Sequence, residues 1–436
     1  MAEVRKQEHE NVADLPEGFK MTELGPLPED WQVVRLGETI RSVKGRKPPV
    51  IIETPLTDGL PYLTAEYFRS NTANQFVPRE FLNSVEICEK NDVVLIWDGS
   101  KAGQVFIGLK GVLASTMVRL DPKPGNLERS FLYFYLLTQF EILNSQTTGS
   151  TIPHVNKTLF FNLLIPLPPL PEQRAIAHVL RTVQRAKEAT VQVIQATREM
   201  KKSLMRHLFT YGPVPVGEAE RVPLRETEVG LVPEHWKVQV LENVASFVRD
   251  SLNPSNYPDE VFDYYSIPAY QETGSPILEV GKRIRSQKLV VEANDVLFGK
   301  LNPRIPKVLL VTASRRRKIT STEFIPLRAS SRTVVPEYLY YLCWSNYVMR
   351  KAQELVSGST PSRQRVDVRA FLSLPVPLPP LSEQREIVRI LQSADKKLQA
   401  EEARKKALEE LFKTLLHNLM TGKVRIKDLL TENGGN

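Results

Sequence analysis

The chain carries the stretch Pro166-Leu167-Pro168-Pro169-Leu170-Pro171-Glu172-Gln173-Arg174, and it repeats almost unchanged as Pro377-Leu378-Pro379-Pro380-Leu381-Ser382-Glu383-Gln384-Arg385. A second pair of motifs stands earlier in each copy: Thr22-Glu23-Leu24-Gly25-Pro26-Leu27-Pro28-Glu29-Asp30-Trp31 and Thr227-Glu228-Val229-Gly230-Leu231-Val232-Pro233-Glu234-His235-Trp236. Gly149-Ser150-Thr151 and Gly358-Ser359-Thr360 lie between them. Matched landmarks in the same order indicate an internal duplication of one unit.

A long helix is predicted after each copy of the Pro-rich stretch. Apolar or small residues recur there every three or four positions, at 176, 179, 183, 186, 190, 193, 197, 200 and 204, and again at 387, 391, 394, 398, 408, 412, 415 and 419. The charged run 401–406 interrupts the second series. Each helix of about 40 residues is roughly 60 Å long. Two such stripes in one chain predict an antiparallel coiled coil, and the alternative is that each helix packs on its own domain.

The part of each unit before its helix reads as mixed α/β. Residues 92–97 and 295–298 are rich in β-branched and aromatic residues and end at turn-forming residues, which is typical of strands. Residues 128–140 and 337–349 have helical patterns. The predicted fold class is therefore α+β, with two mixed α/β domains separated by the antiparallel coiled coil and related by a pseudo-twofold repeat. The predicted boundaries are 1–21 for an N-terminal segment, 22–170 and 213–381 for the domains, and 171–212 and 382–436 for the helices, the last with a C-terminal tail.

Composition narrows the cellular setting. The two cysteines, Cys88 and Cys343, are too few for a disulfide framework or a four-thiolate zinc site. The first residues are polar and charged, with no apolar segment typical of a secretion signal. No run of about 18 apolar residues predicts a membrane span. We expect a cytoplasmic protein.

Positive charge is concentrated in one segment. The net charge of the chain is +8, whereas residues 282–318 hold eleven Lys or Arg and two acids, so that 11 − 2 gives +9. Clustered positive charge is typical of a protein with a polyanionic partner, and the alternative is a solvated basic face.

Sequence motifs of catalysis are absent. The chain has no Gly-x-Gly-x-x-Gly or Walker loop, and its six histidines show no metal-ligand spacing. Pro258-Asp259 with Glu279 and Lys282 resembles a nuclease carboxylate–lysine set only faintly, because the usual Glu-x-Lys spacing is missing. We therefore predict no catalytic residues, no metal and no cofactor on this chain.

Side chains suited to binding a ligand occur on corresponding loops of the two units. The turn at Trp97-Asp98-Gly99-Ser100-Lys101-Ala102-Gly103 corresponds to Phe298-Gly299-Lys300-Leu301-Asn302-Pro303-Arg304. Glycines permit close backbone approach, and Arg, Lys, Asn and Gln bind phosphates or base edges. The candidate DNA contacts are Arg41, Lys44, Arg46, Lys47, Lys101, His154, Asn156, Lys157, Lys282, Arg283, Arg285, Lys300, Arg304, Arg315, Arg316, Arg317, Arg363, Gln364 and Arg365. Because the two copies carry different sets, they predict two readers of different sequences, although a plain surface role stays open for each residue.

The repeated motifs resemble those of the specificity subunits of type I restriction–modification enzymes. The resemblance rests on the Thr-Glu-x-Gly-x-x-Pro-Glu-x-Trp motif that opens each half and on the Pro-rich motif ending in Glu172, Gln173, Arg174 and in Glu383, Gln384, Arg385. It covers about residues 22–422.

This resemblance implies two target-recognition domains that each read one half of a split, asymmetric DNA site. It implies double-stranded DNA, two modification (methyltransferase) subunits and restriction subunits as partners. S-adenosylmethionine, ATP and Mg would then belong to those partner subunits. Two alternatives stay open: a self-contained DNA-modifying enzyme with a diverged site, and a coiled-coil scaffold without a DNA role.

Overall fold

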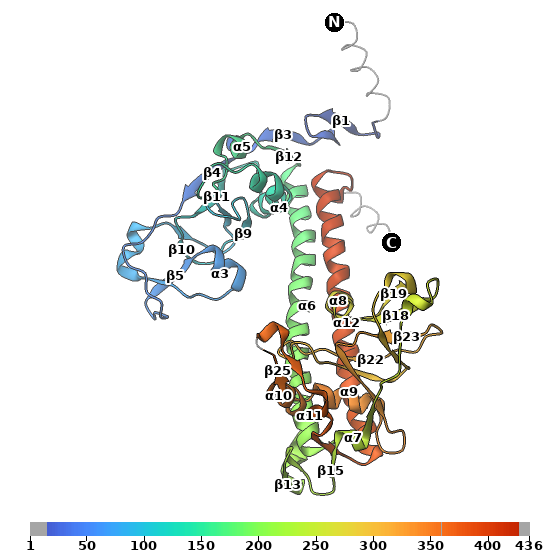
Figure 1. The fold of residues 1–436 in the computed structure, drawn as a ribbon. Helices are drawn as coiled ribbons and strands as arrows, with labels where there is room; N and C mark the ends of the chain where they lie inside the picture. Colours follow the sequence, from blue (N-terminus) through green and yellow to red (C-terminus); the bar gives the residue numbers. More distant parts are fainter. Residues whose placement is uncertain (1–14, 359, 427–436) are drawn as a thin grey trace, which may run out of the picture. The chain divides into compact units, whose positions relative to one another are not determined.

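The computed structural model describes residues 15–358 and 360–426 (Figure 1). Of the predicted N-terminal segment and C-terminal tail, residues 1–14 and 427–436 lie outside the described residues, as does Ser359 of the second Gly-Ser-Thr motif. Packing divides the chain into two units, residues 1–191 with 404–436, and residues 192–403. Each unit thus combines one mixed α/β domain with half of each long helix.

The first unit contains two four-stranded sheets and two strand pairs. The sheets have the orders β6-β5-β10-β7 and β4-β11-β8-β9, and the pairs are β1-β2 and β12-β3. Its strands are β1 (Phe19–Thr22), β2 (Gly25–Pro28), β3 (Gln32–Arg35), β4 (Ile40–Lys44), β5 (Gly59–Leu63), β6 (Phe76–Pro78), β7 (Ile87–Cys88), β8 (Val93–Ile96), β9 (Val105–Ile107), β10 (Gly111–Leu113), β11 (Met117–Pro122) and β12 (Leu164–Leu167). Its short helices are α2 (Leu36–Thr39), α3 (Ala65–Ser70), α4 (Arg129–Ser145) and α5 (Lys157–Asn162).

The second unit repeats this plan. Its sheets have the orders β16-β24-β21-β22 and β17-β20-β23-β18-β19, and its pairs are β13-β14, β15-β27 and β25-β26. Its strands are β13 (Leu224–Thr227), β14 (Gly230–Pro233), β15 (Lys237–Val240), β16 (Ala245–Phe247), β17 (Ser251–Leu252), β18 (Val261–Tyr265), β19 (Ile277–Val280), β20 (Lys288–Val291), β21 (Val296–Gly299), β22 (Val308–Leu310), β23 (Lys318–Thr320), β24 (Phe324–Ala329), β25 (Val356–Ser357), β26 (Arg365–Val366) and β27 (Pro375–Leu378). Its short helices are α7 (Leu241–Val244), α8 (Ile267–Thr273), α9 (Pro336–Trp344), α10 (Asn346–Glu354) and α11 (Val368–Leu372).

Sheet topology confirms the duplication beyond the motifs. In each unit one strand pair is parallel, β5 with β10 in the first and β18 with β23 in the second, while the paired strands around them are antiparallel. The predicted strands at 92–97 and 295–298 are β8 and β21. The predicted helix at 337–349 is wrong as one element: it breaks at Ser345, whose side chain accepts a hydrogen bond from Val348 N and caps α10.

Two long helices run through both units. They are α6 (Leu170–Tyr211) and α12 (Leu381–Met420). Lys187 lies over the ring of Phe412, Arg198 pairs with Glu402, and Lys201 pairs with Asp395. Residue numbers therefore rise along one helix as they fall along the other, which confirms the predicted antiparallel pairing (Figure 1).

The predicted seam of α6 is wrong at Val193 and Met200, while Val179 packs against the core of the first unit. Ile194 is buried, whereas Val193 and Met200 are 37% and 45% exposed. The seam of the structure instead contains Leu180, Lys187, Ile194, Lys201 and Leu208, which are spaced seven residues apart. Val179 and Leu180 fit a heptad equally well, so hydrophobicity alone leaves two registers open. The structure adopts the register that puts two lysine stems in the seam, because an aromatic ring and a carboxylate receive their ammonium groups.

The seam of α12 is not interrupted by its charged run. Glu401 and Lys405 are half-buried at the heptad positions between Leu398 and Leu408. No helix within residues 15–358 and 360–426 is long and apolar enough to cross a membrane.

Candidate nucleic-acid interface

In the first unit the structure brings the predicted turn at 97–103 against the segment that follows Gly149. Gly99 N donates to Pro153 O at 2.8 Å, and Val155 N donates to Trp97 O at 2.9 Å. Gly99 has φ +118, a backbone conformation that favours glycine. The pairing places Lys101 and His154, both exposed, on adjoining loops. We call this pair of loops, 97–103 and 149–157, the first loop pair.

Asp98 holds two of the candidate basic residues at the first loop pair. Its Oδ2 lies 2.9 Å from Lys44 Nζ, and its Oδ1 lies 2.7 Å from His154 Nδ1. The Asp98 side chain is only 14% exposed, whereas those of Lys44 and His154 are about half exposed. A nearly buried carboxylate therefore orients two exposed basic side chains.

The second unit builds the same arrangement with other residues. Asn302 N donates to Gln364 O at 2.8 Å, and Val366 N donates to Lys300 O at 3.0 Å. Glu323 receives Arg365 through two hydrogen bonds of 3.0 Å, the counterpart of Asp98 with His154. We call the loops 299–307 and 363–366 the second loop pair.

A buried lysine shapes the second loop pair. Lys307 is 3% exposed, and its ammonium donates to the carbonyl oxygens of Leu301, Asn302 and Ile305 at 3.1, 3.4 and 2.6 Å. Burial lowers the pKa of Lys307. Three carbonyls bound to one cation fix the turn that presents Arg304, which is exposed and makes no ion pair with any described residue.

The strongly basic segment is not one continuous positive patch, which corrects the expectation from its charge. Lys288, Lys307 and Lys318 are 6%, 3% and 8% exposed, and their ammonium groups bind backbone carbonyls. These three lysines support the fold of the second unit, because an ammonium buried without acceptors would be strongly unfavourable.

Acids outside the basic segment neutralise four of its candidate residues. The pairs are Lys282–Asp259 at 3.9 Å, Arg283–Glu279 at 3.7 Å, Arg316–Asp263 at 2.6 Å and Arg317–Glu260 at 3.3 Å. Burial acts to raise the pKa of Asp263, but hydrogen bonds from Arg316 and Ser314 outweigh it, and the net pKa is lowered. Asp259 and Glu279, the acids of the faint nuclease pattern, thus hold basic side chains.

Several candidates stay exposed without an ion pair to any described residue. They are Arg41, Lys47, Lys101, Lys157, Arg285, Lys300, Arg304, Arg315 and Arg363, of which Lys300 is partly covered. Arg46 makes a distant pair with Glu86 at 4.0 Å. Asn156 is placed differently from the expectation of a free base-reading amide: its Oδ1 accepts Leu159 N at 3.1 Å and caps α5. Asp367 caps α11 in the same way.

The Glu-Gln-Arg motifs form two structural junctions. Gln173 and Gln384 are fully buried, and each side chain makes three hydrogen bonds to backbone groups. Arg174 and Arg385 are exposed. The motifs therefore attach each long helix to its own domain, with the glutamines buried and the arginines exposed.

The glutamates of the same motifs bind the tryptophans of the opening motifs. Trp31 Nε1 donates to Glu172 Oε2 at 3.1 Å, and Trp236 Nε1 donates to Glu383 Oε2 at 2.8 Å. The two most strongly repeated motifs of the sequence are thus one structural contact, made once in each unit. Among the described residues, no group of three or more His, Cys, Asp or Glu side chains is arranged to hold a metal ion.

The family model described as "Type I restriction modification DNA specificity domain" matches residues 28–196 and 233–410, one stretch in each repeat. The chain belongs to this family. The type I restriction enzyme MjaVIII specificity subunit of Methanocaldococcus jannaschii is 31% identical over 95% of this chain and 97% of its own length. The EcoDI specificity subunit of Escherichia coli is 24% identical over 84% of this chain and 81% of its own.

A solved structure has a fold similar to that of this chain. The crystal structure of a type I restriction–modification S subunit from M. genitalium has a TM-score of 0.61 at 17% identity, and the match covers 93% of this chain and 97% of that one. The predicted fold class, two mixed α/β repeats with two long helices, is confirmed.

Analysis of the sequence did not identify Asp98 and Glu323, the two acids that orient the basic side chains of the loop pairs. Asp98 stands beside Gly99 in the predicted turn, a weak signal that an acid shapes that loop. Glu323 lies 42 residues before its partner Arg365, and no motif in the sequence links the two. The backbone of Lys300 brings the pair together, because Lys300 N donates to Glu323 O at 2.9 Å and Lys300 O accepts from Val366 N at 3.0 Å.

Proposed function

We propose that this chain is the non-catalytic, DNA-reading subunit of a type I restriction–modification complex. In this proposal each loop pair binds one half of a bipartite, asymmetric site on double-stranded DNA. The observation that carries the proposal is the repetition of one loop arrangement with different exposed residues: Lys101 and His154 in the first unit, Arg304, Arg363 and Arg365 in the second. A shared frame with different side chains fits two readers of two sequences.

The same proposal assigns partners and boundaries. Two modification subunits and the restriction subunits supply the chemistry, with S-adenosylmethionine, ATP and Mg bound to them. We keep the boundaries 22–170 and 213–381 for the recognition domains, and 171–212 and 382–436 for the helices. The two cysteines are buried and free, which supports a reducing cytoplasm.

We expect the isolated chain to bind DNA with a steep dependence on salt. Removing Arg304 and Arg363 together (Arg304→Ala with Arg363→Ala) should weaken binding by about 10- to 100-fold and reduce the slope of log K against log salt by about one for each lost phosphate contact. Fluorescence anisotropy with a duplex carrying the target measures both quantities.

The matched control is Arg389→Ala, since this exposed arginine of α12 already pairs with Glu386 at 2.5 Å. We expect its binding to equal that of the unchanged chain. Binding that is indifferent to salt would contradict the proposal. Methyl transfer from labelled S-adenosylmethionine to DNA by the isolated chain would favour the self-contained enzyme instead.

A further inference from the structure

His154 and Arg365 occupy the same position of the repeat. The residue after His154 donates its N–H to Trp97 O at 2.9 Å, and the residue after Arg365 donates its N–H to Lys300 O at 3.0 Å. His154 thus corresponds to Arg365, as Trp97 corresponds to Lys300. One position of the shared frame therefore carries a basic side chain in both units, but in two chemical forms.

The carboxylates that hold these two side chains come from different positions of the repeat. Asp98 stands in the turn of the first loop pair, at the place that Leu301 takes in the second. Glu323 stands at the place that Thr116 takes in the first unit, since the backbone oxygens of both accept the N–H of the corresponding turn residue at 2.9 Å. Two acids from unrelated positions therefore meet one requirement, which is to hold the basic group of each loop pair.

In both pairs the carboxylate is the covered partner and the basic group is the exposed one. The side chains of Asp98 and Glu323 are 14% and 27% exposed, whereas those of His154 and Arg365 are 46% and 48% exposed. Asp98 Oδ1 lies 2.7 Å from His154 Nδ1, and Glu323 Oε2 lies 3.0 Å from Arg365 Nε. Charge-assisted hydrogen bonds of this kind fix the direction in which each exposed group points.

Three segments surround the ring of His154. Asp98 faces it from the turn, and Lys44 of β4 binds the other oxygen of Asp98 at 2.9 Å. Lys101 of the same turn is exposed. Gly149 leaves room for the ring, because a Cβ there would lie 2.9 Å from His154 Cδ2. The imidazole therefore contacts one carboxylate through Nδ1, and its Nε2 makes no hydrogen bond to any described residue.

Both basic groups keep N–H groups for a ligand. Arg365 donates to Glu323 through Nε and Nη2, and its Nη1 lies 3.4 Å from the backbone oxygen of Arg363. The edge formed by Nη1 and Nη2 is left for a bidentate contact. On His154 the hydrogen on Nδ1 faces the carboxylate of Asp98, so Nε2 donates only when the ring is protonated.

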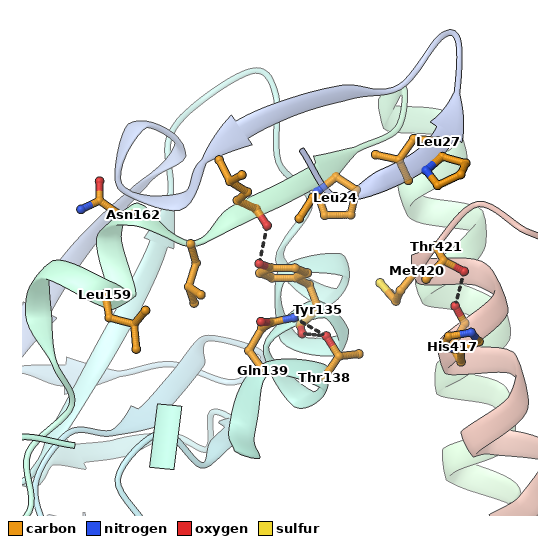
Figure 2. Close-up of a pocket in the computed structure, with 14 residues that line it drawn as sticks. Leu24, Leu27, Tyr135, Thr138, Gln139, Leu159, Asn162, His417, Met420 and Thr421 are labelled. Atoms are coloured by element: carbon orange, nitrogen blue, oxygen red, sulfur yellow. Dashed lines mark hydrogen bonds between the residues drawn. The ribbon is translucent and has the colours of Figure 1, made fainter. Parts of the chain in front are cut away.

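Polar groups of the apolar cleft in the first unit are used differently. Figure 2 shows this cleft, of about 480 Å³, with Leu24 and Tyr135 beside it. Tyr135 Oη donates to Leu164 O at 2.6 Å, and Thr421 Oγ1 donates to His417 O at 2.7 Å, as the dashed lines mark. These groups bind the protein itself, whereas the loop pairs keep donors for a ligand.

Guanine is the base that such donors recognise. In the major groove it presents the acceptors N7 and O6 side by side, whereas adenine presents an acceptor next to an amino donor. A guanidinium binds both acceptors of guanine at once, and an imidazolium donates to one of them. A carboxylate that already orients the donor reduces the rotamer freedom that is lost on binding.

We infer that His154 and Arg365 are the specificity-determining residues of the two loop pairs: each donates to a guanine of its own half-site, and Asp98 and Glu323 position them. This inference rests on the proposed function, because it names the bases that the loop pairs read. Histidine loses its charge between about pH 5 and 8, whereas arginine keeps it. Reading of guanine in the first half-site should therefore weaken as the pH rises, and reading in the second should not.

Selection of bound duplexes from a random library by the full chain, at about pH 6 and about pH 8, tests this contrast. We expect the guanine preference of one block to fall by about tenfold between the two pH values, and that of the other block to stay constant. His154→Arg should make the first block independent of pH, because it gives the first loop pair the side chain of the second. The matched control is His235→Arg, which changes another histidine–carboxylate pair, of 2.6 Å with Glu383, and should leave both blocks and their pH dependence unchanged.

Variants of the two acids separate positioning from simple neutralisation. Asp98→Asn and Glu323→Gln each remove a negative charge, so an acid that only neutralises would, on removal, strengthen binding and leave the guanine preference unchanged. We expect instead that the affected block loses its guanine preference by about tenfold or more. Arg365→Lys should do the same to the second block, because lysine keeps the charge without the planar fork. In each variant the other block should stay intact, which shows that the chain is folded.

Three results would overturn the inference while keeping the proposed function. They are two blocks without guanine, guanine preferences that these variants leave unchanged, and a pH dependence that survives in His154→Arg. A chain that selects no sequence at all would overturn the proposed function as well.

Discussion

Replacing Gln173 or Gln384 by alanine is expected to lower the free energy of unfolding by about 4 kcal/mol, because three buried backbone groups lose their partners at about 1–3 kcal/mol each. Gln173 Oε1 accepts Glu128 N, and its Nε2 donates to the carbonyl oxygens of Asn126 and Pro168, all at 2.8 Å. Gln384 makes the same three bonds to Val335, Thr333 and Pro379 at 2.9 Å. Urea denaturation followed by circular dichroism measures the loss.

The neighbouring arginines provide the control for this prediction. Arg174→Ala and Arg385→Ala change the same motifs at exposed side chains, and we expect each to stay within about 0.5 kcal/mol of the unchanged chain. If the glutamine and arginine variants were equally stable, the glutamines would not join helix to domain, and the repeated motif would need another explanation.

Replacing Glu172 by alanine should cost more than the same change at Glu383, although both occupy one position of the repeat. Glu172 binds Arg425 through two hydrogen bonds of 2.6 and 2.7 Å, and the Arg425 side chain is only 10% exposed. Hydrogen bonds to Glu172 raise the pKa of Arg425, so the guanidinium stays charged. Removing the carboxylate leaves a nearly buried cation without its main partner, at about 3–5 kcal/mol.

At the second junction the loss should be about 1–2 kcal/mol. Glu383 accepts Trp236 Nε1, and its other oxygen lies 2.6 Å from His235 Nε2, but the His235 side chain is 55% exposed and water can replace the carboxylate. Chemical denaturation of Glu172→Ala and Glu383→Ala compares the two. Equal losses would contradict the account of Arg425, and Arg425→Met should show whether the cation causes the difference.

Much of the fold could be predicted from the sequence, because duplication repeats every signal. The two Pro-rich motifs mark the starts of α6 and α12 to within a few residues. Period alone could not choose the seam register of α6, since Val193 and Ile194 are equally apolar. The choice depends on where Phe412 and Asp395 lie on the other helix, which no local pattern records.

The loops of the candidate interface could be predicted from the sequence, but the ion pairs that neutralise its basic residues could not. Glycines and basic residues identified both turns, and the structure brings Lys101 near His154 and Lys300 near Arg365 through backbone pairing. Counting charges misjudged residues 282–318, because four of its cations pair with acids that precede it in the chain or lie just outside it. Three of these pairs join positions 23 or more apart, which no local pattern records, whereas Arg283 and Glu279 are only four positions apart.

The helix-entry motifs show a further limit of sequence reasoning. Their recurrence indicated that the motifs matter. The sequence alone does not show, however, that the glutamine of each motif is buried and the arginine next to it is exposed. The bond of each Glu to the Trp of the opening motif spans 141 residues in the first unit and 147 in the second. In the sequence, only the recurrence of both motifs in each repeat indicated that the Trp of one motif contacts the Glu of the other.

Selection of bound duplexes from a random DNA library tests the central claim most directly. For the unchanged chain, sequencing should return two short blocks separated by an unread spacer of fixed length. For Arg304→Ala with Arg363→Ala, one block should lose definition while the other stays intact, because each loop pair reads its own half. A single continuous block, or the loss of both blocks in this variant, would contradict the account of two separate readers on one duplicated chain.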